Sequence, residues 1–403
     1  MKNLKKLCFL GLFVAVMTMP FSAYAAEGSR YFIKSNSQFW KNAFNARNEF
    51  EEGFTADLND WQFKFGRILG LNIEQVPVFQ ILPESIAETP QKLKASAKTG
   101  VTRLVPSDQT PWGIEYVYKD PNITKTLGGG GGDGTRVAVL DTGITQSHPD
   151  LKARVAKCED FTDLRFPVVE GKCVDKNGHG THVSGIIAAD GGSDGLGIYG
   201  VAPQASLYAF KVCSQNGSCY ADDISVAVRK AADEGANIIN LSLGSDKPSS
   251  LISSAIDYAT SKRVLVVAAG GNDGPYPASI DYPAAQANVI AVGAFGLNFV
   301  IPDWSSRGIN SKTTPFVVEE QDMELAAPGV NIESTWKDGG YAILSGTSMA
   351  APFVSGLAAK YWQLFALEAN PMQSIRNFLH TNALDIDGLG DDNATGFGFA
   401  RVQ

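Results

Sequence analysis

From residue 135 onward, the chain alternates between apolar runs that predict strands and amphipathic runs that predict helices. TRVAVLD (135–141) and VLVVAAGGN (264–272) are dominated by apolar residues, which is typical of strands buried on both faces. YADDISVAVRKAADEG (220–235) has helical periodicity and ends at a glycine. The repeated alternation predicts an α/β fold with a mainly parallel, twisted sheet and helices on both faces. Ligands of such sheets bind at the carboxyl ends of the strands.

The first 25 residues have the features of a signal peptide. Basic residues precede an apolar run at 7–19 that is too short to span a bilayer, and small residues follow at Ala23 and Ala25. A membrane anchor is the alternative, but no longer apolar run follows. We expect secretion, cleavage near Ala25 and no membrane association afterwards.

Residues 26–107 read as a separate, small α+β domain that precedes a large domain at 108–403. RYFIKSNS (30–37) and VPVFQIL (76–82) predict strands, and the aromatic residues between Phe39 and Phe54 indicate a helix. The net charge of −8 argues against a nucleic-acid partner, because phosphate binding requires a basic surface.

The cysteines indicate disulfides in an exported chain. Cys8 lies in the predicted signal peptide, and the other four are Cys158, Cys173, Cys213 and Cys219. An even number of cysteines in an oxidising compartment suggests two disulfides, and four cysteines allow three connectivities. Proximity in sequence favours Cys158–Cys173 and Cys213–Cys219. Zinc ligation is the alternative, but the sequence has no C-x-x-C pair.

Reactive side chains follow predicted strands or begin predicted helices. Asp141 ends a strand, His179 begins a helix and Ser348 begins another. A serine hydroxyl becomes nucleophilic when an imidazole accepts its proton and a carboxylate orients that imidazole. Asn272 ends a further strand, and its amide could donate to a developing oxyanion. Taken singly, these residues are equally typical of helix caps and turns.

VAVLDTGI, NGHGTHVSGII, NLSLG, AAGGN and GTSMAAP resemble, in this order, the signature blocks of the subtilisin-like serine peptidases. In that family the catalytic residues follow one another as Asp, His and Ser, and the three candidates occur in the same order here. The resemblance covers about residues 108–403, and residues 27–107 resemble the family's inhibitory, folding-assisting propeptide. It implies that His179 is the base, that His182 packs nearby without binding metal, and that the product is a secreted, monomeric endopeptidase acting on proteins and peptides.

The resemblance also implies the substrate pocket. Two walls and a floor are expected, formed by Ser242, Leu243 and Gly244, by Ala269, Gly270 and Gly271, and by Asp281, respectively. An acid in the floor would attract Lys or Arg side chains of the substrate. In the alternative, Asp281 points to solvent.

Calcium and self-processing are further implications of the resemblance. The expected Ca²⁺ ligands are the side chains of Gln109, Asp150 and Asp194 and the carbonyls of Leu196 and Ile198. Removal of the propeptide is expected near Arg103 or Asp108.

Two other functions compete with this interpretation. One is a binding protein on an inactive peptidase scaffold, against which the complete set of reactive residues argues. The other is an esterase of the α/β-hydrolase type, although GTSMA lacks the second glycine of G-x-S-x-G.

Overall fold

The structure is a computed structural model that describes residues 30–82, 104–120, 131–310, 317–388 and 390–402. The predicted signal peptide, Cys8 and Arg103 lie outside the described residues. The chain divides into two compact units, which are Met1–Val78 with Arg165–Pro167, and Phe79–Leu164 with Val168–Gln403. The N-terminal stretch of the smaller unit ends at Val78, well before the processing points expected near Arg103 or Asp108, which stay predictions.

The smaller unit is an antiparallel sheet with two helices. Its elements are β1 (Arg30–Ile33), α2 (Gln38–Phe44), β2 (Glu49–Phe50), β3 (Gly53–Asp57), α3 (Asp60–Ile68) and β4 (Ile73–Gln75). The strand order is β2-β3-β1-β4. Ile33, Phe44, Phe54 and Ile73 are buried in its core.

The helix expected over residues 39–54 is only half correct. It ends at Phe44 because Asn45 adopts a left-handed conformation with φ of 54°, which asparagine tolerates at a helix end. The chain then forms the β2–β3 hairpin, and Phe54 is buried from a strand.

The larger unit is built on a ten-stranded sheet with the order β18-β19-β15-β14-β13-β11-β6-β9-β7-β8. The strands of this sheet are β6 (Arg136–Asp141), β7 (Val155–Asp160), β8 (Val169–Glu170), β9 (Ser206–Lys211), β11 (Ile238–Leu241), β13 (Leu265–Ala269), β14 (Ile290–Phe295), β15 (Leu325–Pro328), β18 (Ala383–Leu384) and β19 (Phe399–Ala400). All neighbouring pairs from β19 to β7 are parallel, and only the edge pairs β7–β8 and β18–β19 are antiparallel. The predicted parallel α/β sheet is confirmed.

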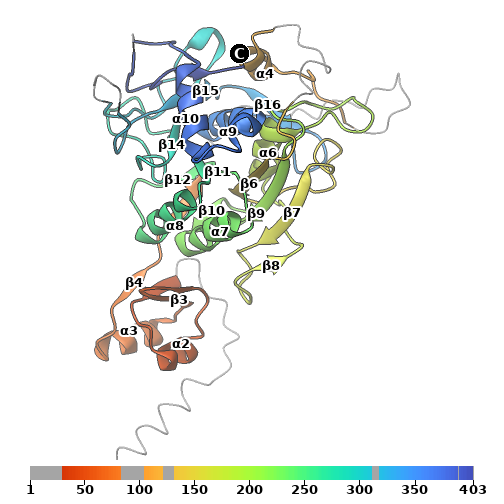
Figure 1. Ribbon diagram of the computed structural model, residues 1–403. Coiled ribbons are helices and arrows are strands. Elements are labelled where there is room, and N and C mark those ends of the chain that lie inside the picture. The colour runs from red at the N-terminus through yellow and green to blue at the C-terminus, as the bar shows by residue number, and fades with distance from the viewer. Residues whose placement is uncertain (1–29, 83–103, 121–130, 311–316, 389, 403) are drawn as a thin grey trace, which may run out of the picture. The chain divides into compact units, whose positions relative to one another are not determined.

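Helices cover both faces of this sheet (Figure 1). The helices of this unit are α4 (Trp112–Tyr118), α6 (His179–Ala188), α7 (Ala221–Asp233), α8 (Ser250–Ser261), η1 (Leu297–Phe299), α9 (Thr347–Phe365) and α10 (Pro371–Thr381). α6 and α9 pack together on one face, and α7 and α8 pack together on the other. Small residues such as Ala350, Ala351 and Ala358 let the buried α9 approach the central strands closely.

Two small sheets complete the larger unit. One has the order β10-β5-β12, with β10 (Ser218–Tyr220), β5 (Val78–Ile81) and β12 (Leu243–Gly244), and the other pairs β16 (Ile332–Thr335) with β17 (Tyr341–Leu344). The structure contains both favoured disulfides, Cys158–Cys173 and Cys213–Cys219.

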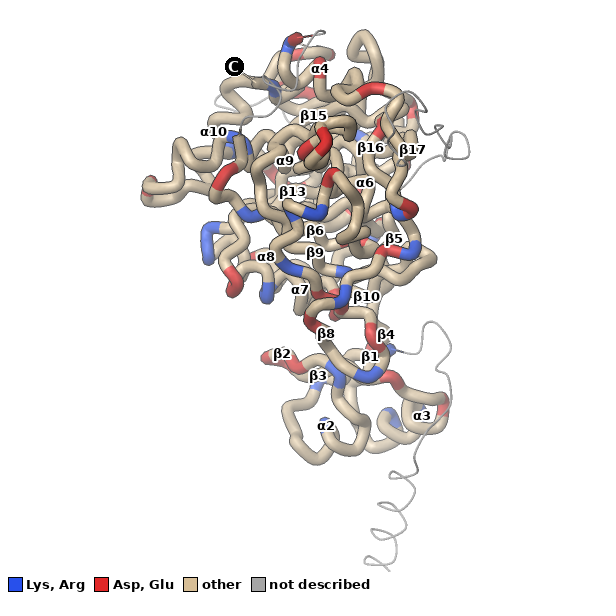
Figure 2. Tube along the Cα trace, turned by 90° about the vertical axis from the view of Figure 1, so that its right-hand side faces the viewer, with Lys and Arg blue, Asp and Glu red and all other residues tan. Residues whose placement is uncertain are grey.

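Acidic and basic positions are interspersed along the trace of the larger unit (Figure 2). Among the described residues, no helix combines the length and the apolar character needed to cross a membrane.

Candidate active site

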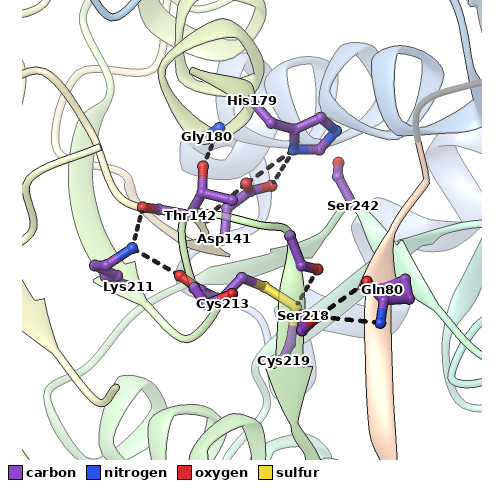
Figure 3. Close-up of a disulfide and its surroundings, with 12 residues drawn as sticks. Gln80, Asp141, Thr142, His179, Gly180, Lys211, Cys213, Ser218, Cys219 and Ser242 are labelled. Atoms are coloured by element: carbon purple, nitrogen blue, oxygen red, sulfur yellow. Dashed lines mark hydrogen bonds and ion pairs between the residues drawn. A yellow bond between two sulfur atoms is a disulfide. The ribbon is translucent and has the colours of Figure 1, made fainter. Parts of the chain in front are cut away.

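Asp141 and His179 form a buried pair at the carboxyl end of β6. His179 Nδ1 lies 2.8 Å from Asp141 Oδ1 and 3.0 Å from Oδ2, and each residue is only 1% exposed (Figure 3). The Thr142 amide also donates to Asp141 Oδ1, at 2.6 Å. Nδ1 therefore carries the proton that the carboxylate accepts, which leaves Nε2 as the nitrogen that can take up another.

The turn before His179 is held by a buried carboxylate. Asp175 accepts hydrogen bonds from the Gly178 amide at 2.7 Å and from the Thr142 hydroxyl at 3.0 Å. Gly178 has φ of 115°, and a methyl group on it would lie 2.5 Å from the Trp336 ring. Only glycine suits this position. The local backbone therefore explains the glycine that precedes His179.

Ser348 is buried near the start of α9. Its Oγ donates to the Ser242 carbonyl at 3.0 Å, and the Ser242 hydroxyl donates to the Ser348 carbonyl at 2.9 Å. His179 Nε2 is buried and has no hydrogen-bond partner among the described residues. The hydrogen bond between the serine and the histidine is therefore not made in this structure.

The Asn272 side chain is oriented by the residue before Ser348. Its Oδ1 accepts from the Thr347 amide at 3.0 Å and from the Thr347 hydroxyl at 2.9 Å. With Oδ1 occupied in this way, Nδ2 must point to the opposite side, where it donates to the Leu82 carbonyl at 2.8 Å. Asn272 thus already binds a peptide carbonyl of this chain.

Residues 79–82 lie in the larger unit as an added strand between two others. Ile81 pairs with Leu243 and Gln80 with Gly244, in antiparallel register. On the other edge, the Ile81 amide donates to the Gly217 carbonyl at 3.0 Å. The Gln80 side-chain amide also donates to the Ser218 hydroxyl at 3.2 Å (Figure 3). An extended peptide is held by main-chain hydrogen bonds in this way when it adds to sheet edges.

The Leu82 side chain lies near Gly244 and Asp281. A methyl group on Gly244 would lie 2.9 Å from Leu82 Cδ1 and 2.7 Å from Asp281 Oδ2. A methyl group on Gly271 would lie 3.1 Å from the same Oδ2. Both expected walls, the segments 242–244 and 269–271, thus contribute a glycine that borders Asp281.

Asp281 does not point to solvent, since only 3% of the residue is exposed. Burial raises the pKa of its carboxyl to about 7, and the nearby carboxylates of Asp273 and Asp246 also act to raise it. Oxygens of these three acids lie within 4.8 Å of one another.

His182 is a buried packing residue. Its Nε2 donates to the carbonyls of Ile332 at 3.0 Å and Ala342 at 3.1 Å. Burial lowers the pKa of the ring to about 3, so the imidazole is neutral. Nε2 is used in these bonds, whereas Nδ1 is buried and has no hydrogen-bond partner among the described residues.

Each expected calcium ligand either belongs to the segment 194–198 or is hydrogen-bonded to it. Gln109 Nε2 donates to the carbonyls of Gly195 and Gly197, at 2.8 and 2.9 Å. The Ile198 amide donates to Asp150 Oδ2 at 2.9 Å, and Asp150 is fully buried. Asp194 Oδ1 accepts from the Leu196 amide at 3.0 Å. The carbonyl of Ile198 accepts from the Gly191 amide at 2.9 Å.

Sequence reasoning missed three residues of this site. Leu82 and Thr347 are the first two, and both act through contacts with Asn272. The third is Lys211, whose ammonium donates to the carbonyls of Thr142 and Cys213 at 2.7 Å each (Figure 3). Burial lowers the pKa of Lys211. A charged residue at the end of the apolar run SLYAFK was the available signal.

These features are those of a serine endopeptidase, and comparison with known proteins assigns the class: the chain belongs to the subtilase family, whose model matches residues 132–398. The chain is 42% identical over 405 residues to Subtilisin from Bacillus sp. (strain TA39), covering 94% of this chain and 93% of that protein. It is 36% identical over 406 residues to M-protease from Shouchella clausii (strain KSM-K16), covering 97% and 96%. The solved structure of Sphericase matches with a TM-score of 0.70 at 49% identity, over 74% of this chain and 99% of that chain. The predicted family is confirmed, and the esterase and inactive-scaffold alternatives are set aside.

Proposed function

We propose that the chain hydrolyses peptide bonds through Asp141, His179 and Ser348. Ser348 Oγ attacks the carbonyl carbon while His179 Nε2 takes its proton, and Asp141 stabilises the resulting imidazolium. Asn272 Nδ2 and the Ser348 amide bind the oxyanion. The tetrahedral intermediate then expels the amine, which takes the proton from His179, and leaves an acyl-enzyme. Water hydrolyses this ester by the same route in reverse.

The binding of the Leu82 carbonyl by Asn272 is the observation that carries this proposal. A carbonyl oxygen 2.8 Å from Nδ2 lies at the distance from a donor that a stabilised oxyanion requires. The strand pairing of residues 79–82 with β10 and β12 supports an extended substrate in the same place.

We infer that the chain is made as a secreted zymogen. The segment 79–82 directly continues from Val78, where the N-terminal stretch of the smaller unit ends, and it occupies the strand position that a substrate would need. This supports inhibition by the chain's own N-terminal region. The Leu82–Pro83 bond joins the bonds near Arg103 and Asp108 as a candidate for the first cut. N-terminal sequencing of the secreted protein distinguishes the three.

Calcium binding is part of the proposal. The side chains of Gln109, Asp150 and Asp194, with the carbonyls of Leu196 and Ile198, offer the oxygen atoms that a hard cation prefers. Gly197 fits this role, because a methyl group on it would lie 1.9 Å from Asp150 Oδ1 and hold the loop away. Bound calcium would hold the 191–198 loop against Asp150.

Removing calcium is expected to lower the melting temperature. An ion present at about 100 times its dissociation constant stabilises a protein by about 2.7 kcal/mol. Thermal unfolding with and without a chelator measures this, and D194A is the matched variant because Asp194 is exposed. The chelator should have less effect on D194A. An unchanged melting temperature in the wild-type protein would rule out calcium stabilisation.

Hydrolysis of casein, compared with short esters, tests the proposed reaction. The wild-type protein should release peptides from casein, and S348A should release none while retaining its melting temperature. Casein hydrolysis that persists in purified S348A would overturn the assignment of the nucleophile.

A further inference from the structure

The position of Leu82 indicates where a substrate places the side chain of the residue before the cleaved bond. The residue whose carbonyl is bound by Asn272 is Leu82, so the Leu82 side chain occupies the place of the substrate residue before the cleaved bond. Leu82 Cδ1 and Asp281 Oδ2 both lie within 3 Å of one point beside Gly244. A Lys or Arg side chain extends at least two atoms further than Leu from the same backbone, and it would bring its cationic group to Asp281.

The Asp281 carboxyl lies where its charged form is poorly solvated. Only 3% of the residue is exposed, so little water reaches it. The nearby Leu82 side chain offers it only hydrocarbon. A cation with N–H groups would stabilise the ionised carboxylate.

The neighbouring charges have the same sign. Asp273 and Asp246 are exposed and have carboxylate oxygens within 4.8 Å of one another and of Asp281. The groups that perturb Asp281 electrostatically are these two acids, and both disfavour its ionisation. The pocket is therefore negative along one side, from the buried floor to the surface.

We propose that Asp281, supported by Asp273 and Asp246, selects substrates with Arg or Lys immediately before the cleaved bond. The proposal rests on the peptidase function proposed above. Asp281 is the specificity-determining residue, and the two exposed acids strengthen the field at the pocket. Leu82, which is neutral, makes the chain's own segment a poor match for the pocket when Asp281 is ionised.

The test uses the processed protein and four peptides that differ only at the residue before the cut, which is Arg, citrulline, Leu or Phe. Citrulline has nearly the shape of Arg without its charge, so the ratio of kcat/KM for the two isolates the charge. We expect the wild-type ratio to exceed that of D281N by roughly 10- to 100-fold. D133N is the matched control. Asp133 is an exposed acid that lies shortly before Arg136, where β6 begins, whereas Asp141 ends the same strand.

The pH dependence is a second readout. Protonation of Asp281 removes its charge, so the Arg preference of the wild-type protein should fall as the pH is lowered from about 9 to about 6. In D281N the Arg-to-citrulline ratio should be flat over this range.

Several results would overturn the proposal. Equal ratios in wild type and D281N would do so, as would a wild-type preference for Leu or Phe at about pH 9. A D281N-sensitive affinity for Ca²⁺ or Mn²⁺ without any Arg preference would assign the three acids to an ion instead. If no peptide is cleaved and Ser348 is unreactive, the proposed function itself fails, and this outcome is distinct from the others.

Discussion

In the proposed mechanism, Asn272 takes part in both substrate binding and catalysis. Thr347 occupies its Oδ1 with two hydrogen bonds, so Nδ2 has a fixed direction before any substrate arrives. A donor that is already oriented requires no reorganisation as charge develops on the carbonyl oxygen. This order is established when the chain folds, because Thr347 immediately precedes Ser348 on α9.

Replacing Asn272 by Ala is expected to lower kcat by about 10²–10³-fold, with a much smaller change in KM. The interaction gains most in the transition state, so its loss affects the chemical step more than ground-state binding. Steady-state kinetics on one peptide measures both constants. N288A is the control, since Asn288 donates to Asp257 on the surface. A rise in KM with kcat preserved would contradict this role.

Asp281 makes stability depend on pH. Its pKa is raised from 3.8 to about 7, so the folded state binds a proton that the unfolded state releases between these values. Stability from the protonated form is therefore present at low pH and lost as pH rises toward about 7. In the S348A protein, D281N should raise the melting temperature at about pH 8 by roughly 2–4 °C and much less at about pH 4. The same gain at both pH values would contradict the shift.

Among the secondary-structure elements, the short strand β10 borders the proposed substrate position. It lies beside β5 in the sheet β10-β5-β12, and the Cys213–Cys219 disulfide closes the loop that leads into it. The disulfide restrains the β10 edge before a peptide binds, which lowers the entropy lost on binding.

Removing this disulfide with C213S and C219S is expected to raise KM for extended peptides several-fold and to leave kcat nearly unchanged. Removing Cys158–Cys173 is the matched control, because its loop pairs at β7 and β8 rather than at β10. Both double variants should lose about 2–5 kcal/mol of stability, but only the first should raise KM. Equal KM values for the two would contradict the role of β10.

The elements were predictable to different degrees. The parallel sheet was predictable because runs such as VAVLD and VLVVAA are apolar with little or no interruption, as strands covered on both faces must be. The helix over residues 39–54 was wrong in its second half because a single left-handed residue, Asn45, redirected the chain. The pairing of β5 with β12 joins residues far apart in sequence, and no local pattern encodes such a contact.

The site shows the same division between local and long-range information. Asp141, His179, Ser348 and Asn272 could be named from their motifs, because strand and helix ends position them. The contacts of Leu82 with Asn272 and Gly244 could not be named, because Leu82 is distant in sequence from both residues.

The molecule as a whole carries a subtilase unit and a segment, residues 79–82, whose strand β5 lies between β10 and β12. The specificity proposed for Asp281 predicts that docking of this segment depends on the charge at position 82. In full-length S348A, L82D should weaken docking because it adds a like charge, and L82R should strengthen it because it adds a cation. Hydrogen exchange of the Ile81 amide, which donates to Gly217, reports docking. We expect faster exchange in L82D and slower exchange in L82R.

The difference in the Ile81 exchange rate between L82D and L82R should shrink when D281N is added. The reason is that Asp281 supplies the negative charge that interacts with residue 82. Equal exchange in L82D and L82R with Asp281 intact would show that the pocket does not sense the charge of its occupant.

Activation of Ser348 by His179 and Asp141 underlies every step of the proposed hydrolysis. Labelling of the processed protein with a fluorophosphonate, followed by mass spectrometry, examines this activation without the need for a known substrate. We predict one phosphonylated residue, Ser348, and loss of labelling in H179A at an unchanged melting temperature. Labelling of another serine, or labelling of Ser348 that is equally fast in H179A, would contradict the activation.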